Sequence, residues 1–478
     1  MQNLEVIIGL EVHVQLKTKS KMFCRCDNRD DQAPNTAICP ICTAQPGALP
    51  LPNAQAIDWA IMASLALGCT INQESKFDRK SYFYPDLPKG YQISQYDKPF
   101  GEHGQLTLNV EGTEKTFRIH RLHLEEDAGK LLHSGTSSLV DLNRAGTPLM
   151  EIVSEPDFRT PQEAKAYMQE LRLIMCYLGV SDADMEKGHL RCDANISLRP
   201  FGSDELFPKT EIKNINSFRA VERALTYEIE RQHGLWEDGQ APKNQSTRGW
   251  DEQTQTTVEQ RTKEEAADYR YFPEPDVPPI IISDEHVLKL KGMIPELPSA
   301  RRERFVTQFN IKSEQADLLV QDKQLADFFE EVASEFDERA GVDSDHQFIA
   351  NWLVNRITVE YRAEHGLGIS AAHTGELLWF LQQGKITAAS AATIFEQMRL
   401  TKKTPEALII ELGLEQMNDT GELEKIVQEV IAANEKVVAE VKAGKTVASQ
   451  FLIGQVMKAS KGKANPKVVH DVLQKLIS

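Results

Sequence analysis

The clearest pattern of hydrophobic and polar positions lies near the N-terminus, where the two kinds of residue alternate strictly from Leu10 to Leu16. The apolar side chains share one face, and Glu11, His13 and Gln15 share the other. Such alternation predicts a half-buried β-strand. Glu11 and His13 would then lie roughly 6.5 to 7 Å apart on one face, a spacing suited to a hard cation or a phosphoryl group. Polar residues of this kind are more often only solvated, so both interpretations stay open.

Similar patterns recur in the first part of the chain. An alternating run over 190–199 and an apolar run over 149–153 predict two further strands, and a third is expected over 117–127. Glu151 is the only charge in its apolar run, where an unpaired carboxylate would be costly. A metal ion or a cationic partner would explain its presence there.

Two helices are expected among these strands. The sequence Thr160-Pro161-Gln162-Glu163 supplies an N-cap, a proline at the first helical position and a capping box, and this helix is expected to run to Gly179. A second helix is expected to start near Ser217 and to end at His233, with Gly234 as the residue that terminates it. The mixture predicts one large α/β domain.

The character of the chain then changes twice. A proline-rich segment, 271–279, predicts a boundary, and beyond about Pro295 the strand pattern gives way to amphipathic helices. A second change comes near residues 402–404, after which short helices carry an excess of lysine. The expected fold is therefore α+β, with a mixed α/β domain over 1–293, an all-α domain over 294–403 and a small all-α tail domain over 404–478.

Charge narrows the classes of function. The 54 lysines and arginines against 71 aspartates and glutamates give a net charge of −17, which argues against a protein that coats nucleic acid generally. Residues 441–478 reverse this balance, with Asp471 as the single acid beside Lys442, Lys445, Lys458, Lys461, Lys463, Lys467 and Lys475. This tail either contacts a phosphate backbone or is simply solvated. The chain begins without a signal-peptide pattern and has no apolar run of membrane-spanning length, so a cytoplasmic location is expected.

Four of the seven cysteines cluster early in the chain, as Cys24-x-Cys26 and Cys39-x-x-Cys42. The odd number and the absence of a secretion signal argue against a disulfide framework. Two close pairs separated by a loop predict a tetrahedral Zn²⁺ site, although the first pair is one residue shorter than is usual. Four free thiols are the alternative. A site closed by four thiolates would have a structural role.

Acidic residues suggest a second metal site. Glu125, Glu126 and Asp127 follow the run Leu122-His123-Leu124, whose alternation places His123 and Glu125 on one face. Several carboxylates and one histidine on separate strands can bind Mg²⁺ or Mn²⁺, provided that the fold brings them together. The sequence contains neither a complete phosphate loop nor a Gly-x-Gly-x-x-Gly fingerprint, so any ATP chemistry must use another fold.

Several longer motifs closely resemble those of the GatB family, which forms one subunit of the bacterial aspartyl/glutamyl-tRNA amidotransferases. The resemblance extends from Ile8-Gly9-Leu10-Glu11 to the tail motif over 451–460 and covers essentially the whole chain. Its most specific motifs occupy residues 75–80, 82–95, 122–130, 140–153, 190–195 and 268–276.

The resemblance implies a function within a heterotrimer of the GatB subunit, an amidase subunit and a small third subunit. The amidase releases ammonia from glutamine or asparagine. The GatB subunit binds tRNA misacylated with glutamate or aspartate, Glu-tRNA(Gln) or Asp-tRNA(Asn), and activates the side-chain carboxylate with ATP. Ammonia then displaces phosphate to give Gln-tRNA or Asn-tRNA. The large domain, called a cradle, is distantly similar to glutamine synthetase, and the tail contacts tRNA.

Given the resemblance, residue roles can be assigned as expectations. Phosphoryl transfer between anions requires a divalent cation, and the expected catalytic and Mg²⁺-binding residues are Glu11, His13, Glu125, Glu126 and Glu151. The expected anion-binding residues for ATP or the tRNA 3′ end are Lys80, Arg144, Lys213 and Arg270. Only some members of the family carry the four cysteines, so zinc would be structural. The chain lacks an amidase Gly-Gly-Ser-Ser signature, so it is not expected to make ammonia itself.

Two other functions are compatible with parts of the sequence. A ligase could act on a small amino acid, as glutamine synthetase does, although the basic tail favours an RNA substrate. A zinc-stabilised, non-enzymatic tRNA-binding scaffold would leave the carboxylates as surface acids. ATP turnover and binding of misacylated tRNA discriminate between these interpretations.

Overall fold

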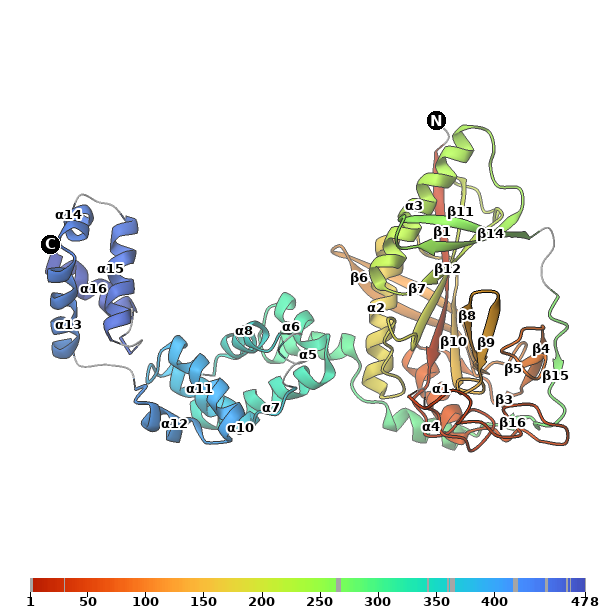
Figure 1. Cartoon of the computed structure of the whole chain (residues 1–478), viewed down its shortest axis with the longest axis horizontal. Coiled ribbons are helices and arrows are strands. Elements are labelled where there is room, and N and C mark those ends of the chain that lie inside the picture. The colour runs from red at the N-terminus through yellow and green to blue at the C-terminus, as the bar shows by residue number, and fades with distance from the viewer. Residues whose placement is uncertain are drawn as a thin grey trace. The chain divides into compact units, whose positions relative to one another are not determined.

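The computed structural model of the chain describes residues 3–29, 31–263, 268–341, 344–358, 361, 366–415, 420–442, 446–460, 463–464 and 466–477. Two compact units divide the chain, Met1–Pro298 and Ser299–Ser478. The first combines a large β-sheet with helices, and the second is helical (Figure 1). A mixed α/β part followed by an all-helical part confirms the coarse fold class expected from the sequence.

In the described part of the first unit, nine strands form one sheet around β1 (Leu4–Gln15). Every neighbouring pair is antiparallel except β12 and β13, which run parallel. The other strands, in sheet order, are β14 (Thr256–Lys263), β13 (Gln245–Asp251), β12 (Thr210–Ile215) and β11 (Leu190–Pro200) before β1, then β10 (Pro148–Ser154), β7 (Thr113–Glu126), β6 (Gly101–Val110) and β2 (Thr70–Ile71).

The predicted alternation of β1 is confirmed. Leu10, Val12 and Val14 are buried in the main hydrophobic core, whereas Glu11 and His13 face the other side of the sheet and are only partly buried. The core also takes side chains from α1 (Ala54–Ala66), α2 (Pro161–Leu178) and α3 (Phe218–Glu237), which pack on the apolar face. Burial of each such aliphatic side chain contributes roughly 1.5 to 3 kcal/mol, so the polar face is left for chemistry.

Helix α2 begins and ends as the sequence predicts. The Thr160 side chain accepts a hydrogen bond from the Glu163 backbone N–H, the Glu163 carboxylate accepts one from the Thr160 N–H, and Gly179 ends the helix in a left-handed conformation. The expected end of α3 at Gly234 is wrong, because the helix continues to Glu237. The extra turn carries Trp236, whose ring packs edge-on against Phe207 with centroids 5.3 Å apart.

Smaller strands lie beside the large sheet. They form a three-stranded sheet of β15 (Phe272–Pro273), β4 (Asp78–Ser81) and β5 (Tyr91–Ser94), a pair of β16 (Ile280–Ile281) with β3 (Glu74–Ser75), and a hairpin of β8 (Lys130–Ser134) with β9 (Ser137–Asp141). Arg79 binds the buried Glu274 through two hydrogen bonds of 2.7 and 2.9 Å. The proline-rich segment 271–279 is therefore fastened to the first unit, which also includes α4 (Asp284–Met293), and the boundary expected there is wrong.

The second unit contains two regions of helix packing. Helix α10 (Ala371–Gln382) packs against α7 (Lys323–Ala340) and α11 (Ala388–Thr401), and α12 (Pro405–Leu412) packs against α10 and α11. A separate apolar cluster joins α13 (Thr420–Ala433), α15 (Thr446–Ala459) and α16 (Pro466–Ile477). The remaining described helices are α5 (Pro298–Gln308), α6 (Ser313–Val320), α8 (His346–Arg356) and α14 (Glu435–Lys442). A division into domains at residues 403 and 404 stays a prediction.

Within the described part of the chain, no helix combines the length and the apolar character needed to cross a lipid bilayer.

Two glycines give a matched test of the fold. A Cβ at Gly104 on β6 would lie 2.4 Å from Cys69 Sγ and 2.7 Å from the Leu67 carbonyl oxygen, whereas nothing lies within 4 Å of a Cβ at Gly234 in α3. We expect Gly104→Ala to lower the free energy of unfolding by roughly 1 to 3 kcal/mol through overpacking. Gly234→Ala should raise it by up to about 1 kcal/mol, because alanine favours helix. Chemical denaturation of both variants measures the difference, and equal effects would contradict the packing described.

Candidate active site

The polar face of the large sheet carries a cluster of carboxylates and imidazoles. His13 on β1 lies directly opposite Glu151 on β10, and Glu151 lies directly opposite His123 on β7. Opposite residues of neighbouring strands point to the same face, and Glu125 follows two residues after His123 on that face. Three adjacent strands therefore bring His13 next to residues that come more than a hundred positions later in the sequence.

The geometry of three of these residues suits a divalent cation. His13 Nε2 lies 3.3 Å from Glu151 Oε2 and 3.8 Å from Glu125 Oε1. One potential ligand atom from each of the three lies within 4.8 Å of the others. Glu125 is only 2% and Glu151 only 6% exposed, so two carboxylates share a nearly dry site whose charge must be balanced. The donor set of two carboxylates and an imidazole fits Mg²⁺ or Mn²⁺.

The pKa values of the cluster residues also show that the two buried carboxylates require positive charge nearby. Burial lowers the pKa of His13, but its hydrogen bond to Glu151 and the charges of Glu151 and Glu125 outweigh burial and raise the pKa to about 9. Burial, followed by the charge of Glu151, raises the pKa of Glu125. Burial acts in the same direction on Glu151, yet the imidazoles of His123 and His13 hold its pKa well below the usual value. An imidazolium thus sits between two acids in the metal-free chain, and a bound metal ion would displace its proton.

His123 is a functional candidate that the sequence reasoning left out. Its Nε2 lies 3.5 Å from Glu151 Oε2 and 3.9 Å from Glu125 Oε2, and its side chain is almost fully buried. Burial lowers its pKa to about 4, so the ring is neutral and able to act as a ligand or an acceptor. The strict alternation from Leu122 to Glu125 was the available signal, because it puts His123 and Glu125 on one face.

Glu11 and Glu126, two of the expected metal ligands, do not join this cluster. Glu11 shares the polar face, but its Oε1 accepts a hydrogen bond of 3.2 Å from Asn195 and lies 4.0 Å from Lys209 Nζ. Glu126 points to the opposite face of β7, where its carboxylate accepts hydrogen bonds from Lys89 Nζ at 2.5 Å and from the Ile93 N–H at 3.0 Å. Of the adjacent pair, the structure therefore brings Glu125 to the cluster, because neighbouring residues on a strand face opposite ways.

Lys80 is the one expected anion-binding residue that faces the cluster. Burial lowers its pKa, but the negative charges of Glu125 and Glu151 raise it above the ordinary value. Its Nζ lies 5.1 Å from the centroid of the Tyr269 ring. Lys80 therefore supplies a fixed positive charge beside the carboxylates.

The other three expected anion-binding residues are engaged elsewhere or exposed. Arg144 donates to the carbonyl oxygens of Ala128 and Gly129. Lys213 donates to Asp193 at 2.5 Å and lies within ion-pair distance of Glu211. Arg270 is exposed. The structure does not bring these three to the cluster.

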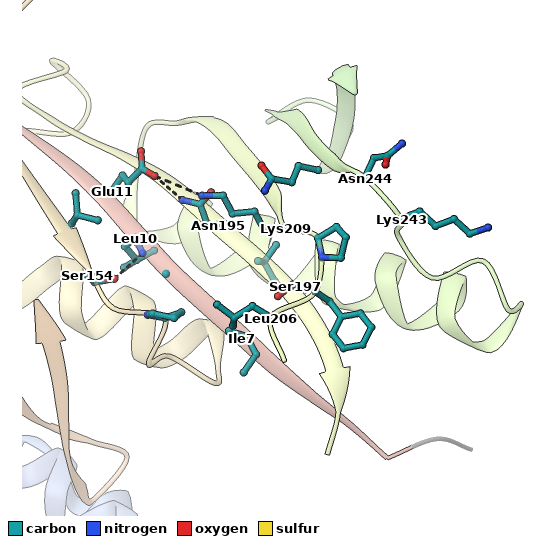
Figure 2. Close-up of a pocket in the computed structure, with 17 residues that line it drawn as sticks. Ile7, Leu10, Glu11, Ser154, Asn195, Ser197, Leu206, Lys209, Lys243 and Asn244 are labelled. Carbon is teal, nitrogen blue, oxygen red and sulfur yellow. Dashed lines mark hydrogen bonds and ion pairs between the residues drawn. The ribbon is translucent and has the colours of Figure 1, made fainter. Parts of the chain in front are cut away.

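A cavity of about 560 Å³ opens along the same face of the sheet (Figure 2). Glu11 and Asn195 lie at one end of the group of side chains drawn, and Lys243 and Asn244 come from a different segment of the chain. Apolar side chains and two lysines line it together, among them Ile7, Pro156, Leu206, Phe207, Lys209 and Lys243. Sequence reasoning missed this cavity, because its lining comes from five separate segments.

The four cysteines meet as their spacing predicts. One sulfur atom from each lies within 4.8 Å of the others, and none of the four forms a disulfide. The Cys24 side chain, through its hydrogen bond to Cys42, lowers the pKa of the Cys42 thiol to about 4. The buried Lys21 ammonium donates to the Ala37 carbonyl at 2.9 Å and adds positive charge nearby. Cys42 is therefore already a thiolate, and four sulfur atoms close together form the set of ligands that a structural Zn²⁺ requires.

Comparison with known proteins decides the family. The sequence model of the GatB/GatE catalytic domain matches residues 6–288, and that of the GatB domain matches residues 327–477. The chain belongs to the GatB family.

Curated relatives match the GatB-family chain over its full length. The GatB subunit of the aspartyl/glutamyl-tRNA(Asn/Gln) amidotransferase of Persephonella marina is 49% identical over 478 residues, covering 99% of both chains. The protein of the same name from Carboxydothermus hydrogenoformans is 47% identical over 486 residues, again with 99% of both covered. That of Brevibacillus brevis is 46% identical and fully covered on both sides. These matches confirm the resemblance seen in the motifs, and the cluster, the cavity and the cysteines all fall in the GatB/GatE catalytic domain.

Metal binding to this GatB-family chain can be tested with two glutamates. We expect Glu151→Gln to weaken Mn²⁺ binding at least about tenfold, since changes to even the outer partners of metal ligands cost about 10- to 100-fold. Glu126→Gln, the same chemical change on the opposite face of β7, should leave the affinity nearly unchanged. Mn²⁺ titration followed by electron paramagnetic resonance measures both. A loss in Glu126→Gln equal to that in Glu151→Gln would contradict the placement of Glu125 in the site.

The cysteine site predicts bound zinc. The purified GatB-family chain should carry about one equivalent of zinc, because four thiolates form one closed tetrahedral site. Cys42→Ser should lose this zinc and unfold at a lower denaturant concentration, since metal binding contributes to folding. Cys69→Ser, which changes a buried cysteine outside the cluster, should keep it. Elemental analysis gives the stoichiometry, and zinc retained by Cys42→Ser would exclude the site.

Proposed function

We propose that this chain is the subunit of a tRNA-dependent amidotransferase that activates and amidates the side chain of glutamate or aspartate carried on misacylated tRNA. The observation that carries the proposal is the His13–Glu125–Glu151 cluster, which lies inside the segment matching the GatB/GatE catalytic domain. The names of the full-length relatives supply the substrates, Asp-tRNA(Asn) and Glu-tRNA(Gln).

The chemistry requires two displacements. A carboxylate oxygen of the aminoacyl side chain attacks the γ-phosphorus of ATP, the bond to the bridging oxygen breaks, and ADP leaves with the electron pair. Ammonia then attacks the acyl carbon, the bond to the phosphate oxygen breaks, phosphate leaves, and the nitrogen loses a proton. Both partners of the first step are anions, so positive charge must lie between them.

The cluster residues supply this positive environment. His13, Glu125 and Glu151 would hold a divalent cation, and such an ion neutralises and aligns phosphoryl oxygens. Lys80 adds a permanent positive charge beside the same carboxylates. The neutral, buried His123 lies beside the same carboxylate, with its Nε2 3.5 Å from Glu151 Oε2.

The cavity beside β1 is the best-supported position for ATP. Its volume lies within the range typical of small-molecule sites, and it offers apolar side chains for a base and Lys209 and Lys243 for phosphates. Glu11 borders the cavity, and His13 follows two residues later on the same face of β1. The cavity and the cluster are therefore about 7 Å apart along one strand, within the reach of a triphosphate.

The proposed reaction also requires other subunits and tRNA. The chain lacks an amidase signature, so ammonia would come from an amidase subunit, held with a small third subunit in a heterotrimer. The tail would contact tRNA through its basic side chains, of which Lys442 and Lys458 are exposed. Lys445 and Lys461 of this basic set lie outside the described residues.

The proposal is tested by amidation of Glu-tRNA with ATP, Mg²⁺ and ammonium chloride in the purified complex with its partner subunits. Ser197→Trp places a large ring in the cavity, and we expect at least a tenfold rise in KM for ATP, because the ring occupies space that the nucleotide needs. Asp204→Trp, the same new side chain at a neighbouring exposed position that does not line the cavity, should leave KM within about twofold.

Release of ammonia by the amidase subunit serves as the control for assembly and should be unchanged in both variants. An unaltered KM in Ser197→Trp would exclude the cavity as the ATP site. A wild-type complex without ATP-dependent amidation would overturn the proposed function itself.

A further inference from the structure

Residues 268–274 run beside β4 and bring tyrosines next to Lys80. The Ser81 N–H donates to the Tyr269 carbonyl at 2.9 Å, and Phe272 pairs with Arg79 in the three-stranded sheet. The Glu274 N–H donates to the Phe77 carbonyl, also at 2.9 Å. The backbone of this segment is therefore held along the whole length of β4.

The ring of Tyr269 is fixed by other aromatic rings. Its centroid lies 6.2 Å from that of Tyr82 and 6.2 Å from that of Tyr271, both in edge-to-face geometry. Tyr271 in turn stacks on Tyr96, with centroids 4.4 Å apart. Contacts of this kind restrict the rotation of a ring, so Tyr269 presents a nearly fixed face to Lys80.

Lys80 has no other anchor in the described part of the chain. No carboxylate or carbonyl oxygen of the described residues lies within hydrogen-bonding or ion-pair distance of its Nζ, whereas the Tyr269 ring lies 5.1 Å away. A lysine has a long flexible stem, and its ammonium occupies one position only if contacts hold it there.

Arg79, the preceding residue on β4, shows the contrast. It lies on the opposite face of the strand, with its guanidinium 4.2 Å from the centroid of the Tyr91 ring. It is also tied to the buried Glu274 by two hydrogen bonds. Its charge is already paired with a buried carboxylate, so Arg79 suits a structural role better than the binding of an incoming anion.

We propose that Tyr269 is a positioning residue, whose ring holds the Lys80 ammonium facing Glu125 and Glu151 to receive the phosphoryl group during carboxylate activation. The contact between a cation and an aromatic face restrains the ammonium without using its three N–H donors. Those donors stay available for phosphoryl oxygens. This role rests on the proposed function, and it adds the group that keeps the lysine in place.

Three variants of the complex test the role of the ring. Tyr269→Leu should lower kcat for ammonium-supported amidation about tenfold, as expected for loss of a partly desolvated cation–aromatic contact. Tyr269→Phe keeps the ring and should stay within about twofold of the wild type. Tyr91→Leu removes the ring beneath Arg79, but the ion pair with Glu274 remains, so kcat should again stay within about twofold. Equal losses in all three variants would overturn the proposal.

A double-mutant cycle separates positioning from a general structural effect. In a Lys80→Met background, Tyr269→Leu should have no further effect on kcat, because the group that it positions is gone. A further tenfold loss in that background would show that Tyr269 acts independently of Lys80 and would overturn the proposal. Retained ammonia release by the amidase subunit shows that each complex is assembled.

Lys80→Met and Tyr269→Leu distinguish a role of Lys80 in the reaction from its positioning by Tyr269. If Lys80→Met leaves ATP-dependent amidation unchanged, the assignment of Lys80 to the reaction is wrong, and the role of Tyr269 falls with it. If Lys80→Met lowers kcat for amidation of Glu-tRNA but Tyr269→Leu equals the wild type, only the positioning role is overturned.

Discussion

The register of β1 between β10 and β11 is the constraint on which the rest of the first unit depends. His13 meets Glu151 only because Val12, Val14 and their neighbours must face the apolar core. A shift by one residue would turn every side chain of β1 to the other face and bury two charges in that core. Burial of the apolar side chains thus fixes where the polar side chains lie, although the two sets are on opposite faces of the sheet.

On the polar face of the sheet, the positions of the acidic side chains follow from the positive charges that neutralise them. Acids there are paired with cations at short range, as Asp127 is with Arg191 at 2.8 Å and Asp193 with Lys213 at 2.5 Å. The His13 cluster differs, because two nearly buried carboxylates share one histidine and a lysine held by an aromatic ring. The paired cations hold the polar face together, whereas the carboxylates of Glu125 and Glu151 keep negative charge that a bound cation would balance.

The loop that carries the four cysteines is hydrogen-bonded to the segment between β7 and β10. Asn143 accepts a hydrogen bond from the Ala37 N–H, and the Met22 N–H donates to the Gly146 carbonyl. The Gly146 N–H donates in turn to the Asp127 carbonyl, just before β10 begins. Residues next to β7 and β10 are thereby connected to the loop that carries the four cysteines. A metal ion bound by these cysteines would also support this end of the sheet.

Local pattern was sufficient to find β1, the capped helix α2, the sharing of one face by His123 and Glu125, and the meeting of the four cysteines, because each depends on strand or helix periodicity or on close spacing. Long motifs were sufficient to find the family. Only the tertiary structure decided that Glu125 and not Glu126 joins His13 and Glu151, that Glu11 borders a cavity, and that Tyr269 faces Lys80. These facts depend on strand register and on contacts between segments more than a hundred residues apart, which sequence periodicity does not encode.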